Sequence, residues 1–377
     1  MLAVLDVVEW QTILDFETGK ETAEKSALAA MAQELLKRNR YPGDMHLESI
    51  SWVTNVALDL YRSYSPQFMF LSFSKPFFSS VFEGADDVKW QVLLTLLFSR
   101  INHFIETTRM TPVVIGTGQM VPLKGYINLS TLDSLACGGG MIPRFAGLYK
   151  PSAGDLKLVR THEHIETVKT KEEIIELFGN NEEFVRRLPD YVLAAREGYA
   201  FKTFGAIARP VHKIPARNME VPVFTPLGEV NSITEIAPLV LKNLETQKVV
   251  LIVLEGIGQD DFLMPYAVCS NSLDWYDYAP GDGQYLTIGS GRHLASHSYF
   301  PGFKYYLDDS KEKKYPLSAY FNKYVPIMIG HSFKGKSAAV GSRSVLTHMA
   351  SGADISVECF ARGLYNYGTI AILKDQA

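Results

Sequence analysis

Short, continuously apolar runs alternate along most of the chain with longer segments whose apolar residues recur at helical spacing. An apolar run of this kind predicts a strand buried on both faces, and helical spacing predicts a covering helix. The expected helices are residues 21–39, 48–63, 86–108 and 170–179, the last with a capping box at Thr170 and Glu173. The expected strands are residues 67–73, 111–116, 190–195, 221–226, 249–256 and 325–330. The pattern therefore predicts an α/β fold with a mainly parallel central sheet and helices on both faces.

Residues 270–324 break this alternation, because Gly, Tyr, Asp and Ser dominate their composition. That composition predicts an excursion or small subdomain outside the core. Within it, "SLDWYDYAPGDGQYL" (272–286) interleaves aromatic and acidic residues. Such a stretch is typical of a covering loop packed by its own aromatic side chains. A sugar or base platform, or a contact between two copies of the chain, is the alternative.

Net charge, apolar runs and cysteine content limit the molecules that the protein is expected to bind and the compartment it is expected to occupy. The 377 residues carry a net charge of −4 with both signs mixed, which does not favour nucleic acid as a partner. No apolar run is long enough to span a bilayer, and the opening residues lack the basic region of a signal peptide. Cys137, Cys269 and Cys359 form no CxxC pair and indicate buried thiols in a reducing compartment. We expect a cytoplasmic protein that binds a small molecule or a protein partner, and an oligomer is compatible with this.

The segment "TPVVIGTGQM" (111–120) ends an apolar strand in a tight Gly-Thr-Gly turn. Ligands and catalytic groups of α/β proteins lie at the carboxyl ends of such strands. The turn nevertheless carries no carboxylate, imidazole or thiol. The sequence therefore has a strand end typical of an active site without the residues that do chemistry there.

The order of segments around this turn resembles the second half of the alkaline phosphatase superfamily. "LYRSYSPQFMFLSFSKPFFSSVFEGADDV", a long helix and "TPVVIGTGQM" are most similar to the type I phosphodiesterases and nucleotide pyrophosphatases. There a strand precedes a proline, a metal-binding Asp and a Gly-His pair, and a later strand ends in Ser-Asp-His-Gly-Met. "HKIPARNMEVPVFTPLG" (212–228) and "ITEIAPLVLKNL" (233–244) continue the resemblance, which covers roughly residues 50–245.

Two arrangements of the remaining residues are open. "KVVLIVLEGIG" (248–258) resembles the first strand of the family, and "SGADISVECFARGLYNYGT" (351–369) resembles its nucleophile segment. Under this interpretation residues 1–245 are the second half of the fold, and residues 246–377 complete the same sheet as a circularly permuted first half. Alternatively, residues 322–360 resemble the carboxyl end of phosphopentomutase-like members, and residues 246–377 form a small second domain with a duplicated end.

The functional residues of the family are mostly missing at the matching positions. Where the family has metal-binding Asp and His residues and a nucleophile, this chain has Phe77, Val81, Thr117, Gly118 and Ala353. Phe, Val and Ala neither bind metal ions nor attack phosphorus. The resemblance thus implies a degenerate member without standard phosphoesterase activity. Such a protein is expected to bind a small phosphorylated or polar ligand, or a protein partner.

The first alternative is a metal-dependent phosphoesterase or phosphodiesterase with a relocated site, using Zn or Mn. His212 matches the last metal-binding His of the family, and Glu255 stands where its first strand has Asp. His293 and His297 are four residues apart, a spacing that puts two imidazoles on one helix face. The alternative to a metal pair is a short loop with two solvent-facing histidines.

The second alternative is a nucleotide-binding protein. "GHSFKGKS" (330–337) fits the P-loop pattern, in which Gly330 and Gly335 shape a backbone cradle for phosphates. Lys336 would contact the phosphates and Ser337 would bind Mg²⁺. A P-loop must follow a strand and open a helix. The strand is expected at residues 325–330, but Gly341 interrupts the helix after Ser337, so an exposed basic turn is the alternative interpretation.

Overall fold

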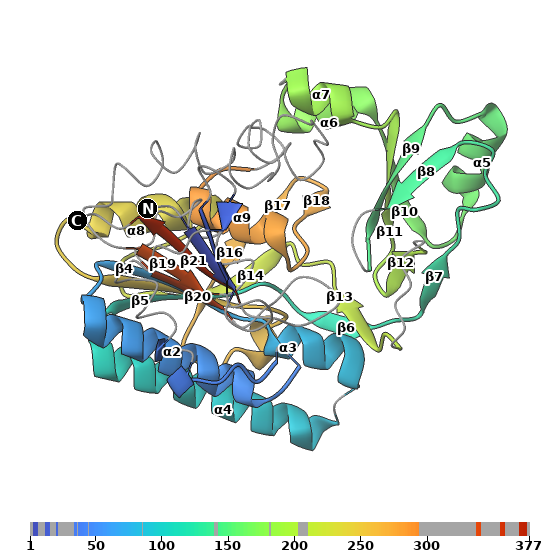
Figure 1. Cartoon of the computed structure of the whole chain (residues 1–377). Coiled ribbons are helices and arrows are strands. Elements are labelled where there is room, and N and C mark those ends of the chain that lie inside the picture. The colour runs from blue at the N-terminus through green and yellow to red at the C-terminus, as the bar shows by residue number, and fades with distance from the viewer. Residues whose placement is uncertain are drawn as a thin grey trace.

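The computed structural model describes residues 34–293 with gaps at 36, 44, 85, 139–141, 181 and 203–209, and short strands outside this range. These strands are residues 3–6, 12–15, 20–21, 337–340, 355–358 and 369–374. The described residues form a layered α/β body and a smaller lobe beside it (Figure 1). No helix in the described ranges is long and apolar enough to cross a membrane.

The central sheet has the strand order β16-β14-β5-β15-β4-β20-β19-β21-β1-β2-β3 among the described residues. Within it β15 pairs in parallel with β4 on one side and with β5 on the other, and its fully apolar sequence fits this interior position. The strands expected at residues 67–73, 111–116 and 249–256 are therefore present and lie side by side. The strands are β1 (Ala3–Asp6), β2 (Thr12–Asp15), β3 (Lys20–Glu21), β4 (Phe68–Phe73), β5 (Thr111–Gly116), β14 (Glu220–Phe224), β15 (Val249–Leu254), β16 (Ala267–Ser270), β19 (Ser337–Val340), β20 (Ile355–Glu358) and β21 (Thr369–Lys374).

The sheet is mixed, and the prediction of a mainly parallel sheet is wrong outside its centre. The pairs β5–β15, β15–β4, β4–β20 and β20–β19 are parallel. The pairs that flank this centre, from β16–β14 and β14–β5 to β21–β1 and β1–β2, are antiparallel. One physical cause is visible at β14. The chain leaves the carboxyl end of β5, passes through the lobe and returns to the same edge of the sheet, so β14 must run opposite to β5.

Helices cover both faces of the sheet, as the sequence predicts (Figure 1). On one face α2 (Glu48–Tyr64) and α4 (Asp87–Thr108) pack on β4, β5 and β15. On the other face α8 (Ile236–Asn243) and α9 (Asp282–Ser290) pack on the same strands and on β14. The side chain of Asp86 caps α4 by accepting a hydrogen bond from the backbone nitrogen of Lys89, so the helix begins where the sequence predicts.

The described part of residues 270–324 belongs to the core, which corrects the prediction of an excursion. The side chain of Tyr285 is fully buried, and the hydroxyl of Ser72 on β4 donates to its hydroxyl oxygen at 3.1 Å. Gln284 and Asn271 are also fully buried and hydrogen-bonded to each other at 2.7 Å. Polar residues can enter a core when their hydrogen bonds are made inside it, so their number in a sequence does not measure exposure.

The lobe comprises residues 125–201 and has its own apolar core, which includes Leu148, Leu193 and Phe201. Its main sheet has the order β10-β11-β9-β8, and β7 pairs in parallel with β12 beside it. The predicted capping box of Thr170 and Glu173 is confirmed at the start of α6. The elements are β7 (Gly125–Ile127), β8 (Leu135–Gly138), β9 (Phe145–Tyr149), α5 (Ala153–Thr161), β10 (Ile165–Thr170), α6 (Lys171–Phe178), α7 (Glu182–Arg187), β11 (Tyr191–Ala195) and β12 (Tyr199–Phe201).

A two-stranded stalk joins the lobe to the body. β6 (Met120–Pro122) leaves the end of β5, and β13 (Lys213–Pro215) returns antiparallel to it before β14 begins. The lobe is therefore an insertion at the carboxyl end of β5 (Figure 1).

Close backbone packing at the end of β5 should make Gly116→Ala destabilising. A methyl group there would lie 2.3 Å from the carbonyl oxygen of Ile257, and backbone atoms cannot yield as a side chain does. We expect a loss of about 1–3 kcal/mol in the free energy of unfolding, measured by urea denaturation. Gly283→Ala in α9 is the control, because nothing lies within 4 Å of the added methyl group. It should leave stability unchanged or raise it by up to about 1 kcal/mol, and equal losses in both variants would contradict the packing.

Candidate functional site

The carboxyl ends of β4, β5 and β15 lie side by side, at the edge of the sheet where α/β proteins place their ligands. Each strand runs into a loop that contains buried polar residues: Ser74 and Lys75 after β4, Thr117 after β5 and Glu255 after β15. The backbone nitrogen of Gly256 donates to the Thr117 hydroxyl at 2.8 Å, so the ends of β5 and β15 are joined directly. Glu255, which precedes Gly256, therefore lies close to Thr117.

Glycines let the three loops approach one another closely. A methyl group on Gly256 would lie 2.8 Å from the Cα atom of Phe77, and φ at Gly256 is +77°. A methyl group on Gly258 would lie 2.7 Å from the backbone nitrogen of Gln119. The loops therefore pack directly against one another at these glycines.

Asn218 fills the space above the Gly-Thr-Gly turn. A methyl group on Gly118 would lie 2.2 Å from the side-chain Cγ of Asn218. The Asn218 Oδ1 atom accepts a hydrogen bond from the backbone nitrogen of Gln119 at 2.7 Å, and Nδ2 donates to the Ala216 carbonyl at 3.0 Å. A backbone N–H that a ligand could bind is thus already satisfied by a side chain of the protein.

Two further amides extend this network. Gln284 on α9 donates through Nε2 to the Thr117 carbonyl at 2.9 Å and to Asn271 Oδ1 at 2.7 Å. Asn271 Nδ2 donates to the carbonyls of Asn218 and Tyr278, both at 2.8 Å. The network connects the β5 turn to α9 and to the chain around β14, so the turn is held from three directions.

Asp277 joins this network to the lobe. The residue is 2% exposed and lies on β18 (Tyr276–Asp277), which forms a hairpin with β17 (Ser272–Leu273). Its Oδ2 atom accepts from the backbone nitrogen of Asn218 at 3.0 Å, and Oδ1 is paired with the guanidinium of Arg144. Arg144 precedes β9, so one carboxylate connects the lobe with the strand-end loops.

Arg144 also faces the carboxylate of Glu166 on β10, with 3.5 Å between the charged atoms. Arg217, which follows β13, pairs with the same carboxylate. Burial lowers the pKa of Arg144, and the negative charge of Glu166 opposes that shift. Two guanidinium groups and two carboxylates therefore alternate where the lobe meets the body.

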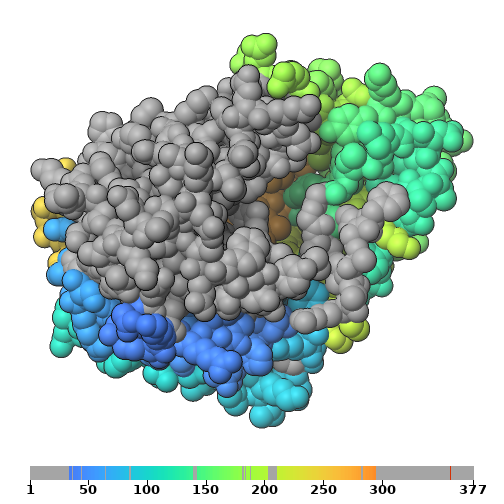
Figure 2. Space-filling model, viewed as in Figure 1, coloured from blue at the N-terminus to red at the C-terminus, as the bar shows by residue number. Residues whose placement is uncertain are grey.

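Aromatic rings make the second contact between the lobe and the body. The ring of Tyr276 stacks on Phe145 with 4.9 Å between centroids, and it meets Phe178 edge-on at 5.2 Å. Trp275 meets Phe145 edge-on with 6.1 Å between centroids, and it contacts Tyr276 at the same distance. Aromatic residues of the segment 272–286 thus contact the lobe, in addition to one another. The space-filling surface is hollowed beside the lobe, and orange residues lie at the bottom of the hollow (Figure 2).

A buried lysine forms a cluster that the sequence analysis missed. Lys75 in α3 (Lys75–Phe78) donates to Glu83 Oε1 and to the Met45 carbonyl, both at 2.6 Å. The Ser79 hydroxyl donates to the other Glu83 oxygen at 2.6 Å. Burial acts to raise the pKa of Glu83, but the hydrogen bonds from Lys75 and Ser79 outweigh it and hold the pKa below its ordinary value. The sequence signal for this cluster is the spacing of Lys75, Ser79 and Glu83, since residues four apart lie on one helix face.

The four residues proposed for a relocated metal site have separate surroundings where they are described. The imidazole of His212 packs on Gly84, and its backbone nitrogen donates to the Val81 carbonyl at 2.8 Å. His293 follows the end of α9 at Gly291, and its Nδ1 atom lies 3.0 Å from the Tyr278 hydroxyl. His297 lies outside the described residues. Within the described ranges, no three His, Cys, Asp or Glu side chains gather closely enough to hold a metal ion.

The positions that hold metal ligands in the resembling family are occupied by buried residues of other types. Phe77 and Val81 pack with Met120 in an apolar cluster, and Thr117 and Gly118 form the turn held by Asn218. Ala353 lies outside the described residues. The side chains present do not fit a two-metal phosphoesterase centre, which needs several carboxylates and imidazoles.

Of the four residues named for the P-loop, the structure describes Ser337. Ser337 is the first residue of strand β19, whereas a P-loop places its Ser or Thr at the start of a helix. Gly330, Gly335 and Lys336 lie outside the described residues.

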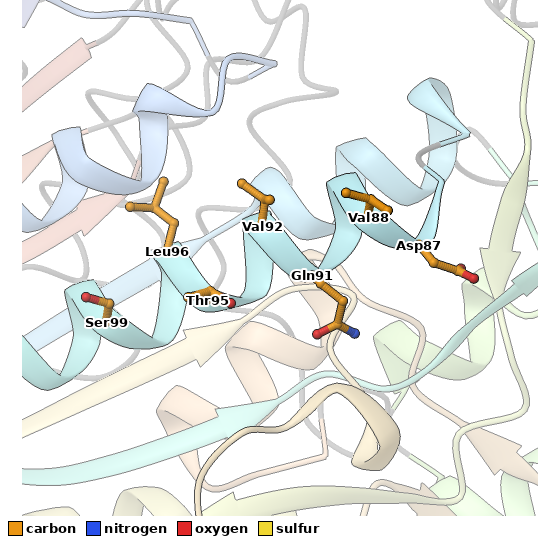
Figure 3. Close-up of a pocket in the computed structure, with 7 residues that line it drawn as sticks. All are labelled: Asp87, Val88, Gln91, Val92, Thr95, Leu96 and Ser99. Atoms are coloured by element: carbon orange, nitrogen blue, oxygen red, sulfur yellow. The ribbon is translucent and has the colours of Figure 1, made fainter.

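A groove of about 680 Å³ lies on the outer face of α4, away from the buried side of that helix. The side chains of Val88, Val92 and Leu96 project from one side of the helix (Figure 3). Val88 is 75% exposed and Val92 is 54% exposed. Asp87, Gln91, Thr95 and Ser99 complete the lining.

Comparison with known proteins adds no family to this description. No protein-family model matches the chain, and no curated protein is significantly similar to it. The functional argument therefore depends on the residues and their geometry.

The lowered pKa of Glu83 predicts a specific acid sensitivity. A carboxylate whose pKa is lower in the folded state contributes stability above its unfolded pKa, here about 4.5, and this contribution is lost as the pH falls through the folded value. Glu83→Gln should therefore be less stable than the wild type at pH 7, and the difference should shrink below about pH 4.5. Urea denaturation across this pH range measures it, with Glu229→Gln on an exposed loop as the control. A difference that does not change with pH would show that the charge of Glu83 contributes nothing.

Proposed function

We propose that this chain is a degenerate alkaline-phosphatase-like protein that binds a small phosphorylated or polar ligand without hydrolysing it. The observation that carries the proposal is the filled strand end. Asn218, Phe77 and the packed loops occupy the edge of the sheet where a hydrolase would hold its metals and substrate. The apolar cluster of Phe77, Val81 and Met120 offers no ligand atoms for metal ions.

The preference for a phosphorylated or polar ligand rests on the charges beside the lobe. Guanidinium groups bind phosphate and carboxylate oxygens through paired hydrogen bonds. Arg217 is 39% exposed at its side chain, and its carboxylate partner Glu166 is shared with Arg144. An anionic group that enters beside the lobe could therefore exchange with Glu166 at Arg217 without uncovering Arg144.

A protein partner is the second candidate, and the outer face of α4 favours it. Exposed Val88 and Val92 lie on one side of a helix whose opposite side is packed on the sheet. Apolar side chains in a shallow groove suit a protein surface better than a phosphate group.

The metal-dependent phosphoesterase with Zn or Mn and the P-loop nucleotide binder gain no support from the described residues. A cytoplasmic location remains part of the proposal. It is supported by Cys137 and Cys269, which are both free. Cys269 is buried as expected, whereas Cys137 is exposed on β8, so the expectation of a buried thiol is wrong there.

Hydrolysis assays test the first half of the proposal. The purified protein should show no turnover of a phosphomonoester or a phosphodiester such as the 4-nitrophenyl compounds, with Mg²⁺, Mn²⁺ or Zn²⁺ added. The reason is that no described cluster can hold two metals about 4 Å apart. Turnover that is abolished by a chelator and by His212→Ala or Glu255→Gln would contradict the proposal and support the relocated metal site.

Thermal denaturation tests the second half. A ligand that binds the native state raises the apparent melting temperature. We expect a rise with inorganic phosphate or a phosphomonoester at millimolar concentration, and its reduction in Arg217→Met. Lys242→Met on the distant helix α8 is the control. No rise with any of these compounds would contradict the small-ligand proposal and leave the α4 face as the favoured site of binding.

A further inference from the structure

The lobe and the body have separate apolar cores. The core of the lobe contains Leu148 and Leu193, whereas the two large clusters of the body are built around β4, β5 and β15. Two units with their own cores can change their relative position without unfolding either one.

Hydrogen bonds attach the stalk to the body, so the two move together. The backbone nitrogen of His212 donates to the Val81 carbonyl at 2.8 Å, and that of Ala216 donates to the Gln119 carbonyl at 2.9 Å. Beyond the stalk, the outgoing chain reaches the lobe at Lys124 and Gly125, where β7 begins. Bending at this point moves the lobe while the stalk and the sheet stay in place.

Among the described residues, the buried contacts that oppose such a movement come from one hairpin. The Arg144–Asp277 pair is the buried charged contact between the lobe and the hairpin of β17 and β18. The stack of Tyr276 on Phe145 and Phe178 is the aromatic contact beside it. Both contacts involve one hairpin of the body. Arg217, beside the stalk, adds a more exposed contact, because it pairs with Glu166 and its backbone nitrogen donates to Glu197 of the lobe at 3.1 Å.

We infer that the lobe is a hinged cover over the strand ends and that the Arg144–Asp277 pair is the latch that keeps it closed. Breaking the pair leaves a buried charge without its partner, and moving the lobe outward exposes that charge to water. Opening therefore relieves the cost of the unpaired charge. It also separates Arg144 from the carboxylate that holds the backbone of Asn218, above the β5 turn. The inference concerns the movement of the lobe and does not depend on the identity of a ligand.

Electron–electron double resonance between two spin labels tests the latch. One label is attached to Cys137 on β8 of the lobe, and the other to a cysteine introduced as Leu241→Cys on α8 of the body, where the side chain is 48% exposed. Cys359→Ser removes the third native thiol. Cys269 stays unlabelled, because burial raises the pKa of its thiol to about 12. The labelled protein with an intact Arg144–Asp277 pair should give a single narrow distribution of distances between the two labels.

Arg144→Met should add a second population at a different distance, and Tyr276→Ala should do the same without removing a charge. Arg160→Met is the control, since this exposed arginine on α5 lies within the lobe, and it should keep the single distance. Hydrogen exchange of the β15 amides, which should stay slow in every variant, shows that the body remains folded. A single unchanged distance in both Arg144→Met and Tyr276→Ala would overturn the inference. A loss of slow exchange in Arg144→Met together with an unchanged distance in Tyr276→Ala would also overturn it, because the pair would then be purely structural.

Discussion

The carboxylate of Asp277 binds both the lobe and the loops at the strand ends, so the position of each depends on the other. It is almost fully buried, and it receives the guanidinium of Arg144 from the lobe and the backbone N–H of Asn218 from the body. A buried charge is tolerated only when its hydrogen bonds and its counter-charge are in place. While both partners are in place, the pair therefore holds the hairpin, the lobe and the chain that enters β14 together.

The position of Asn218 in turn explains why the turn after β5 carries no catalytic or ligand-binding group. Its side chain lies against Gly118 and satisfies the backbone of Gln119, so the turn after β5 is complete without a ligand. Gly116 and Gly256 allow the neighbouring loops to close around it. A strand end of this kind is retained because the sheet and its loops require it. In the proposed binding role, anions would meet Arg217 beside the lobe.

The sequence predicts the regular parts of this arrangement well and the connections between them poorly. The apolar run of β15 correctly predicts an interior strand, because a strand without polar residues must be buried on both faces. The mixed character of the sheet depends on the path through the lobe, which local periodicity does not contain. The burial of Tyr285 was hidden by its polar neighbours, whose hydrogen bonds form with residues distant in sequence. Arg144 and Asp277 gave no signal, since 132 intervening residues separate them.

A double-mutant cycle on Arg144 and Asp277 measures the central interaction directly. Urea denaturation would give the free energy of unfolding for Arg144→Met, for Asp277→Asn, which keeps an acceptor for Asn218, and for the double variant. We predict that each single change costs about 3 kcal/mol or more, because it removes one partner of a buried ion pair. The double variant should cost less than the sum of the two by about 1 kcal/mol or more. Costs that add to within about 0.5 kcal/mol would contradict the account, because the two residues would then not act through each other.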